Sequence, residues 1–77
     1  MDDLIQQLTE LTRRRFGASA DGLSADDDLF EVLGIDSLQA LELLTDLEDT
    51  FDVEVPDYEV RGVNTLRGLA VLLSRRL

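Results

Sequence analysis

The sequence predicts an all-α fold, a small up-and-down bundle of three main helices with a short third helix before the last one. In three separate stretches, leucines and other apolar residues recur three or four positions apart, which is the spacing of one helix face. The chain has 77 residues and no cysteine, so packed helices have to form its core without disulfides. The alternating segment Val53-Glu54-Val55 finds no second segment with which it could pair as a strand.

The first main helix is expected over about residues 2–16. Asp2 and Asp3 stand at the end where the helix dipole favours negative charge, and Arg13-Arg14-Arg15 stand at the other end. We interpret these arginines as complements to the dipole that also keep this end soluble, with a basic patch for a partner as the alternative. Gly17 fits a C-cap. The apolar face consists of Leu4, Ile5, Leu8, Leu11 and Phe16.

Residues 17–36 form a long first loop that we expect to be ordered, because apolar residues spaced along it can anchor it to the bundle. A short helical turn is expected near residues 29–33. The acidic run Asp26-Asp27-Asp28 does not fit a calcium loop, since Glu31 occupies the position of the required glycine. The apolar anchors are Leu23, Leu29, Phe30, Val32, Leu33 and Ile35.

The second main helix is expected over about residues 37–51, and its two sides differ. The side predicted to face the core holds Ala40, Leu43, Leu44, Leu47 and Phe51, with Leu41 at its margin. The opposite side holds Leu38, Glu42, Thr45, Asp46 and Asp49. An apolar Leu38 among these acids favours a contact with a partner protein.

After an extended connector that ends at Pro56, Asp57 is expected to cap a short helix through Arg61, which Gly62 stops. The last main helix is expected over about residues 65–76, capped by Asn64 or Thr65. Its apolar face consists of Leu66, Leu69, Ala70, Leu73 and Leu77.

Composition excludes several function classes. The chain has no histidine, cysteine or lysine, so it cannot form a Ser–His or Cys–His nucleophile pair or a Schiff-base lysine, and we expect no enzyme activity and no metal site. Its formal net charge of −10 disfavours nucleic acid and implies partners with basic patches. No signal-like or membrane-spanning run is present, so we expect a soluble, cytoplasmic protein. We also expect a monomer.

The most informative stretch is Gly34-Ile35-Asp36-Ser37-Leu38. Gly34 allows a turn that other residues resist, and Asp36 with Gln39 makes a weak capping-box pattern. The hydroxyl of Ser37 then stands at the first turn of a helix, where free N–H groups favour an anion. A serine after an aspartate at a helix start is also a common plain cap.

Over about residues 26–73 the chain resembles the acyl and peptidyl carrier proteins. Leu29-Phe30-Glu31, Leu33-Gly34, Asp36-Ser37-Leu38 and Val53-Glu54-Val55-Pro56 fall in the order found in that family. The resemblance implies that residues 1–77 form a single carrier domain. It also implies that a phosphopantetheinyl transferase, using coenzyme A and magnesium, attaches 4′-phosphopantetheine to Ser37.

The same resemblance implies that the 4′-phosphopantetheine group is a flexible arm that holds acyl groups as thioesters and presents them to partner enzymes with basic docking patches. These partners are acyltransferases or ligases, ketosynthases or other condensing enzymes, and tailoring enzymes. The positions that such partners read are matched by Asp36, Leu38, Glu42, Thr45, Glu48 and Asp49. The short third helix and the apolar side of the second are expected to form a cleft for the acyl chain.

Departures from the family pattern narrow the type. Fatty-acid carriers commonly have Asp where Gln39 stands and an apolar residue where Thr45 stands, and peptidyl carriers more often have Gly-Gly than Leu33-Gly34. The run over residues 33–43 looks most like polyketide-type carriers, and we expect a free-standing one. A discrete peptidyl carrier, a fatty-acid carrier and a non-acylated acidic helical adaptor remain alternatives.

Overall fold

The computed structural model describes residues 2–77, apart from the side chain of Asp57, and over these residues its regular elements are all helical. This confirms the predicted all-α class, with three main helices and a short helix before the last. The elements are α1 (Asp2–Phe16), the 3₁₀ helix η1 (Gly17–Ala20), α2 (Leu29–Leu33), α3 (Ser37–Phe51), α4 (Asp57–Val60) and α5 (Leu66–Ser74).

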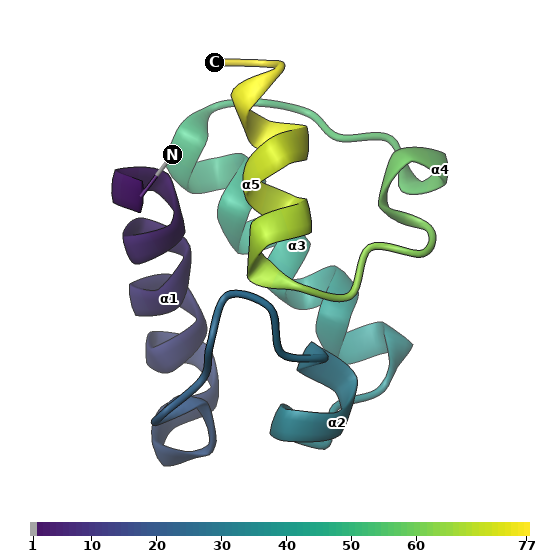
Figure 1. The fold of residues 1–77 in the computed structure, drawn as a ribbon. Coiled ribbons are helices and arrows are strands. Elements are labelled where there is room, and N and C mark those ends of the chain that lie inside the picture. Colours follow the sequence, from purple (N-terminus) through teal and green to yellow (C-terminus); the bar gives the residue numbers. More distant parts are fainter. Residues whose placement is uncertain (1) are drawn as a thin grey trace.

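The three main helices pack side by side, with α1 against both α3 and α5 (Figure 1). In Figure 1, α1 runs down the molecule and α3 runs back up. The connection over residues 52–65, which includes α4, carries the chain back down, so that α5 also runs upward. The start of α3 therefore lies near α2 at the lower end, away from the two termini.

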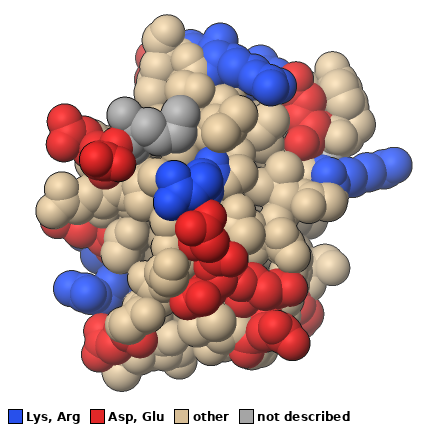
Figure 2. Space-filling view, in the orientation of Figure 1, with Lys and Arg blue, Asp and Glu red and all other residues tan. Residues whose placement is uncertain are grey.

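The long first loop is ordered, as predicted, because backbone hydrogen bonds attach it to the start of α5. The N–H of Leu29 donates to the carbonyl oxygen of Asn64 at 2.8 Å, and the N–H of Arg67 donates to that of Ala25 at 3.0 Å. Asp28 caps α2 through one carboxylate oxygen and accepts from the Asn64 amide with the other. Acidic side chains gather over α2 and the loop leading into it (Figure 2).

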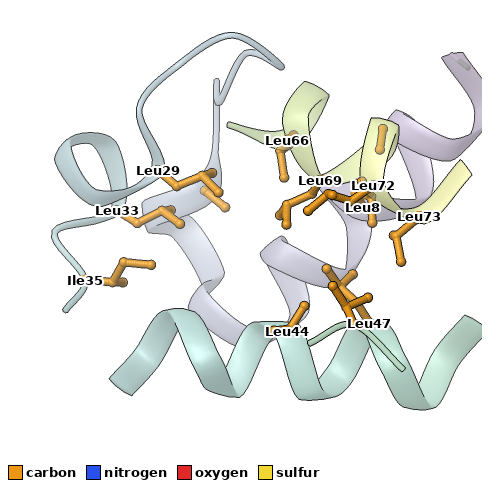
Figure 3. Close-up of a cluster of buried hydrophobic side chains, with 13 residues drawn as sticks. Leu8, Leu29, Leu33, Ile35, Leu44, Leu47, Leu66, Leu69, Leu72 and Leu73 are labelled. Atoms are coloured by element: carbon orange, nitrogen blue, oxygen red, sulfur yellow. The ribbon is translucent and has the colours of Figure 1, made fainter. Parts of the chain in front are cut away.

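The core lies between the three main helices and extends toward α2 (Figure 3). Its most deeply buried large side chains are Leu8, Leu47, Leu66 and Leu73. On α3, Leu43, Leu44 and Leu47 are buried, whereas Ala40 and Phe51 are only half-buried at the edge of the core and Leu41 is 43% exposed. The predicted core side of α3 is therefore correct, since Ala40 and Phe51 pack against the core and Leu41, predicted at its margin, is the more exposed residue.

Thr12 is a buried polar residue that the apolar pattern of α1 does not reveal. Its hydroxyl donates to the carbonyl oxygen of Leu8 at 2.8 Å, which satisfies the polar group inside the helix itself. Such a local bond removes most of the penalty for burying a hydroxyl. Thr12 therefore behaves as part of the core.

The bounds of two helices, α4 and α5, differ from the sequence prediction. The short helix α4 begins at Asp57, not after it, so Pro56 occupies the cap position and the predicted Asp57 cap is wrong. The proline already has the fixed φ of −60° that leads into a helix. The helix ends at Val60, one residue before the predicted Arg61.

The last helix, α5, begins after Thr65, whose hydroxyl accepts from the N–H of Gly68, so Thr65 and not Asn64 is the cap. It ends at Ser74, two residues early, where the Ser74 hydroxyl donates to the carbonyl oxygen of Val71. A serine that bonds back to its own helix competes with the regular pattern. Leu77 lies beyond this end and is 66% exposed, so its predicted place on the apolar face is wrong.

Candidate functional site

A tight turn between α2 and α3 positions the start of α3. Gly34 is left-handed, with φ 64° and ψ 32°, and its N–H donates to the carbonyl oxygen of Phe30. Asp36 accepts from the N–H of Gln39 at 2.9 Å, while the Gln39 side chain accepts from the N–H of Asp36 at 3.2 Å. The predicted capping box is therefore formed.

Ser37 is the first residue of α3, and it is exposed. Because Asp36 provides the cap, the Ser37 hydroxyl is not needed to start the helix, and no hydrogen bond joins it to another described residue. It stands beside the first backbone N–H groups of a helix of 15 residues, which point outward and carry partial positive charge. This position suits a hydroxyl whose oxygen bears a phosphate.

A groove of about 540 Å³ opens beside Ser37, between α2, α3 and the segment from α4 to α5. Its walls are predominantly apolar, with Ser37, Arg61 and Asn64 as the polar exceptions. The apolar lining consists of Leu29, Phe30, Ile35, Ala40, Leu41, Leu43, Leu44, Val60, Val63 and Leu69. The cleft expected between the short helix and the second main helix is thus present, and the candidate serine lies on its lining.

The residues expected to meet partner proteins all lie on or next to α3, but they are not equally available. Leu38 is 65% exposed, and Asp49 is exposed as well. The hydroxyl of Thr45 donates to the carbonyl oxygen of Leu41 at 3.0 Å. Glu48 is half-buried, and its Oε2 accepts from the N–H of Val55 at 2.9 Å. Glu48 therefore attaches the connector to α3, a role that the sequence prediction missed.

Arg15, at the end of α1, reaches across to the acidic side of α3. Its Nε and Nη2 atoms donate to the two carboxylate oxygens of Asp46, and Nη1 donates to Oε2 of Glu42 at 3.0 Å. The hydrogen bond from Arg15 lowers the pKa of Asp46 and raises the pKa of Arg15 itself. Arg15 follows Leu11 by four positions, so the sequence places it on the same side of α1 as that apolar residue, although it does not indicate which helix lies opposite.

Within residues 2–77, none of the helices combines the length and the apolar character needed to cross a membrane.

Comparison with known proteins agrees with this geometry. A family model described as "Phosphopantetheine attachment site" matches residues 6–73, which is most of the chain. An "Acyl carrier protein homolog" from Mycoplasmopsis pulmonis (strain UAB CTIP) is 32% identical over 73 residues, covering 95% of this chain and 89% of the relative. The chain therefore belongs to the acyl carrier protein family, whose members carry a covalently bound 4′-phosphopantetheine and act as carriers and not as enzymes.

Proposed function

We propose that Ser37 is the attachment residue and that its hydroxyl oxygen carries 4′-phosphopantetheine through a phosphodiester. The observation that carries the proposal is the division of roles in the capping box: Asp36 starts α3, and the hydroxyl of Ser37 stays exposed beside the groove. The first-turn N–H groups favour the negative phosphate. When bound, the group supplies the thiol that this chain lacks, so that acyl groups are held as thioesters.

The chain's own residues then anchor the arm and shelter its cargo. The apolar groove walls, among them Phe30, Leu41 and Val63, can remove part of an acyl chain from water. The volume of about 540 Å³ is in the range of small-molecule pockets. Catalysis belongs to the partner enzymes, for which this chain is the substrate.

We propose that partner enzymes with basic patches read the exposed side of α3 through Asp36, Leu38, Glu42, Thr45 and Asp49, with Glu48 at its inner edge. These partners are the phosphopantetheinyl transferase, acyltransferases or ligases, ketosynthases or other condensing enzymes, and tailoring enzymes. The formal net charge of −10 favours fast encounter with such basic patches. Leu38 offers an apolar anchor one residue from the modified serine.

We propose a polyketide-type pathway for the cargo, on the basis of the run over residues 33–43. The alternatives are a discrete peptidyl carrier and a fatty-acid carrier. The proposed setting is a monomeric carrier domain spanning residues 1–77 in the cytoplasm.

Intact mass tests the attachment residue. The parent, incubated with coenzyme A, magnesium and a broad-specificity phosphopantetheinyl transferase, should gain one phosphopantetheine, and Ser37→Ala should gain none. Ser19→Ala is the matched control, since Ser19 is also exposed but lies in η1, and it should load like the parent. Modification of Ser37→Ala at the parent's rate would overturn the assignment.

Charge reversal tests the partner-facing side of α3. Asp49→Arg should slow loading, because the new positive charge opposes a basic partner, and higher transferase concentration should restore part of the rate. Glu10→Arg is the control, since it makes the same change on the exposed surface of α1. Equal rates for the two variants would overturn recognition through this side of α3.

The cargo type is tested on the loaded protein with two enzymes. An acyltransferase supplied with a dicarboxylic acyl-coenzyme A should add its acyl group, whereas an adenylating ligase supplied with amino acids and ATP should not. Loading by the ligase alone would favour the peptidyl alternative.

A further inference from the structure

We propose that Arg15 is a specificity-determining residue of the docking side of α3, the exposed side that holds Asp36, Leu38, Glu42, Thr45 and Asp49. Its guanidinium competes with the cations of partner enzymes for the acids that those partners bind. This inference rests on the proposed partner recognition through α3. It adds to that recognition a residue from a different helix.

The geometry of the pair is what gives Arg15 this role. All three guanidinium nitrogens are used, two on Asp46 and one on Glu42. A planar guanidinium matched to a carboxylate in this two-pronged way is better ordered than a lysine ammonium would be. Glu42, one of the expected partner contacts, is therefore already occupied by a cation of the same chain.

The pair is also accessible enough to be exchanged. The side chains of Arg15, Glu42 and Asp46 are 33%, 48% and 31% exposed, so a partner's cation can approach the same oxygens. An ion pair that is about one-third to one-half exposed is weak enough for a partner's cation to displace it, yet the energy needed to displace it opposes binding. A groove between α1 and α3, lined by Arg14, Arg15, Asp46 and Asp49 among others, continues the docking side toward α1.

The Arg15 ion pairs distinguish two classes of partner, according to whether the partner needs Glu42. A partner that needs Glu42 has to displace Arg15, while a partner that binds through Leu38 and Asp49 does not. Removal of Arg15 should favour the first class selectively. Arg14 provides the matched control, because it is the adjacent arginine, it is exposed, and it forms no ion pair with any side chain that the structure describes.

We assign the phosphopantetheinyl transferase to the first class, since Glu42 is among the acids proposed for its docking. The experiment compares Arg15→Gln with Arg14→Gln, which have the same net charge, as substrates of a broad-specificity phosphopantetheinyl transferase at low salt. Loss of an exposed ion pair corresponds to roughly two- to fivefold in binding, so Arg15→Gln should lower KM by about that factor relative to Arg14→Gln, with kcat unchanged. The difference should disappear when Glu42→Gln and Asp46→Asn are present in both proteins.

A binding measurement gives a second readout that does not depend on loading. In a Ser37→Ala background, Arg15→Gln should bind the transferase more tightly than Arg14→Gln, and added salt should reduce the difference. Equal or weaker binding by Arg15→Gln, or a change in kcat, would overturn the proposal for Arg15. Failure of the parent to load at Ser37 would overturn the proposed attachment instead, so the two failures are distinguishable.

Discussion

The carboxylate of Glu48 and the backbone N–H of Val55 are joined by a hydrogen bond of 2.9 Å that ties the extended connector to α3. Val55 is buried, so this bond holds a core side chain in place at the point where the chain leaves the helix. Glu48 is for this reason a structural residue as well as a neighbour of the proposed docking side.

Removing the Glu48 carboxylate should lower stability. Glu48→Ala leaves the partly buried N–H of Val55 without its acceptor, and the free energy of unfolding should fall by about 1–2 kcal/mol. Glu48→Gln should lose less, because its amide oxygen can still accept. Urea unfolding measures both, with Asp49→Ala as the exposed neighbour for comparison. A loss for Asp49→Ala as large as that for Glu48→Ala would contradict this role.

Core truncations should rank by burial. Leu47 is 1% exposed, and Leu47→Ala should lower the free energy of unfolding by roughly 2–5 kcal/mol, since a core this small cannot close the cavity. Phe51 is only half-buried at the edge of the core, so Phe51→Ala should lose less than a fully buried aromatic residue would. Leu38→Ala should change stability by less than about 0.5 kcal/mol. Thermal or urea unfolding of the three variants measures these losses. A loss for Leu38→Ala as large as that for Leu47→Ala would contradict the ranking by burial.

Gly68 in α5 packs closely against the residues that precede the helix. A Cβ at this position would lie 2.9 Å from Cγ1 of Val63 and 3.2 Å from Oγ1 of Thr65. Val63 is β-branched and stiff, and it lines the groove. Gly68→Ala should therefore destabilise the protein by about 1–2 kcal/mol, although alanine is the better helix former.

The control for Gly68 is the same change in a Val63→Ala background, which removes the nearest atom. In that background, Gly68→Ala should lower the free energy of unfolding by less, because the higher helix propensity of alanine then offsets the remaining steric contact. A gain in stability from Gly68→Ala alone would mean that Val63 moves aside freely.

The Arg15–Asp46 pair should give stability a specific dependence on pH. The pKa of Asp46 is lowered in the folded protein by the hydrogen bond from Arg15. A lowered folded-state pKa means that the stabilisation is fully present above the unfolded value, near 3.9, and is lost as the pH falls through the folded value. The stability difference between the parent and Asp46→Asn should thus be constant around neutral pH and shrink below about pH 4.

Urea unfolding from pH 7 to pH 3 measures this difference. Asp49→Asn serves as the comparison, since Asp49 forms no ion pair within residues 2–77. A difference for Asp46→Asn that grows toward acid pH would reverse the expected sign.

Self-repulsion should make stability depend on salt. The chain has seventeen acids and only seven arginines, and the repulsion among the excess negative charges is screened at higher ionic strength. The melting temperature should therefore rise from low to moderate salt. A melting temperature that stays flat over that range would mean that repulsion does not limit stability.

The sequence predicted those parts of the molecule that local rules determine. The left-handed Gly34, the capping box of Asp36 and Gln39, and the bounds of α1 and α3 each depend on residues within one or two helical turns. Contacts between distant elements were not predictable in this way. The sequence predicts for Arg15 a role at the end of α1 and not its pairing with Glu42 and Asp46, because that pairing depends on how α1 and α3 pack.

The same limit applies to Glu48, to the ion pair of Glu59 with Arg76, and to the groove beside Ser37. Each joins segments whose relative position is set by the packed core. The groove in particular requires α2, α3 and the residues before α5 to meet, and local sequence patterns do not determine that meeting.

The capping box has a consequence for a carrier protein on which several enzymes act in turn. Asp36 and Gln39 maintain the shape of the helix start, while the neighbouring Ser37 hydroxyl is left out of that task. Under the proposed attachment, the chemistry at Ser37 can therefore change, from a bare hydroxyl to a charged or discharged arm, while the backbone at the helix start keeps its conformation. On this proposal, successive enzymes meet the same helix start, and each recognises the carrier by its backbone while distinguishing its state only by what the arm holds.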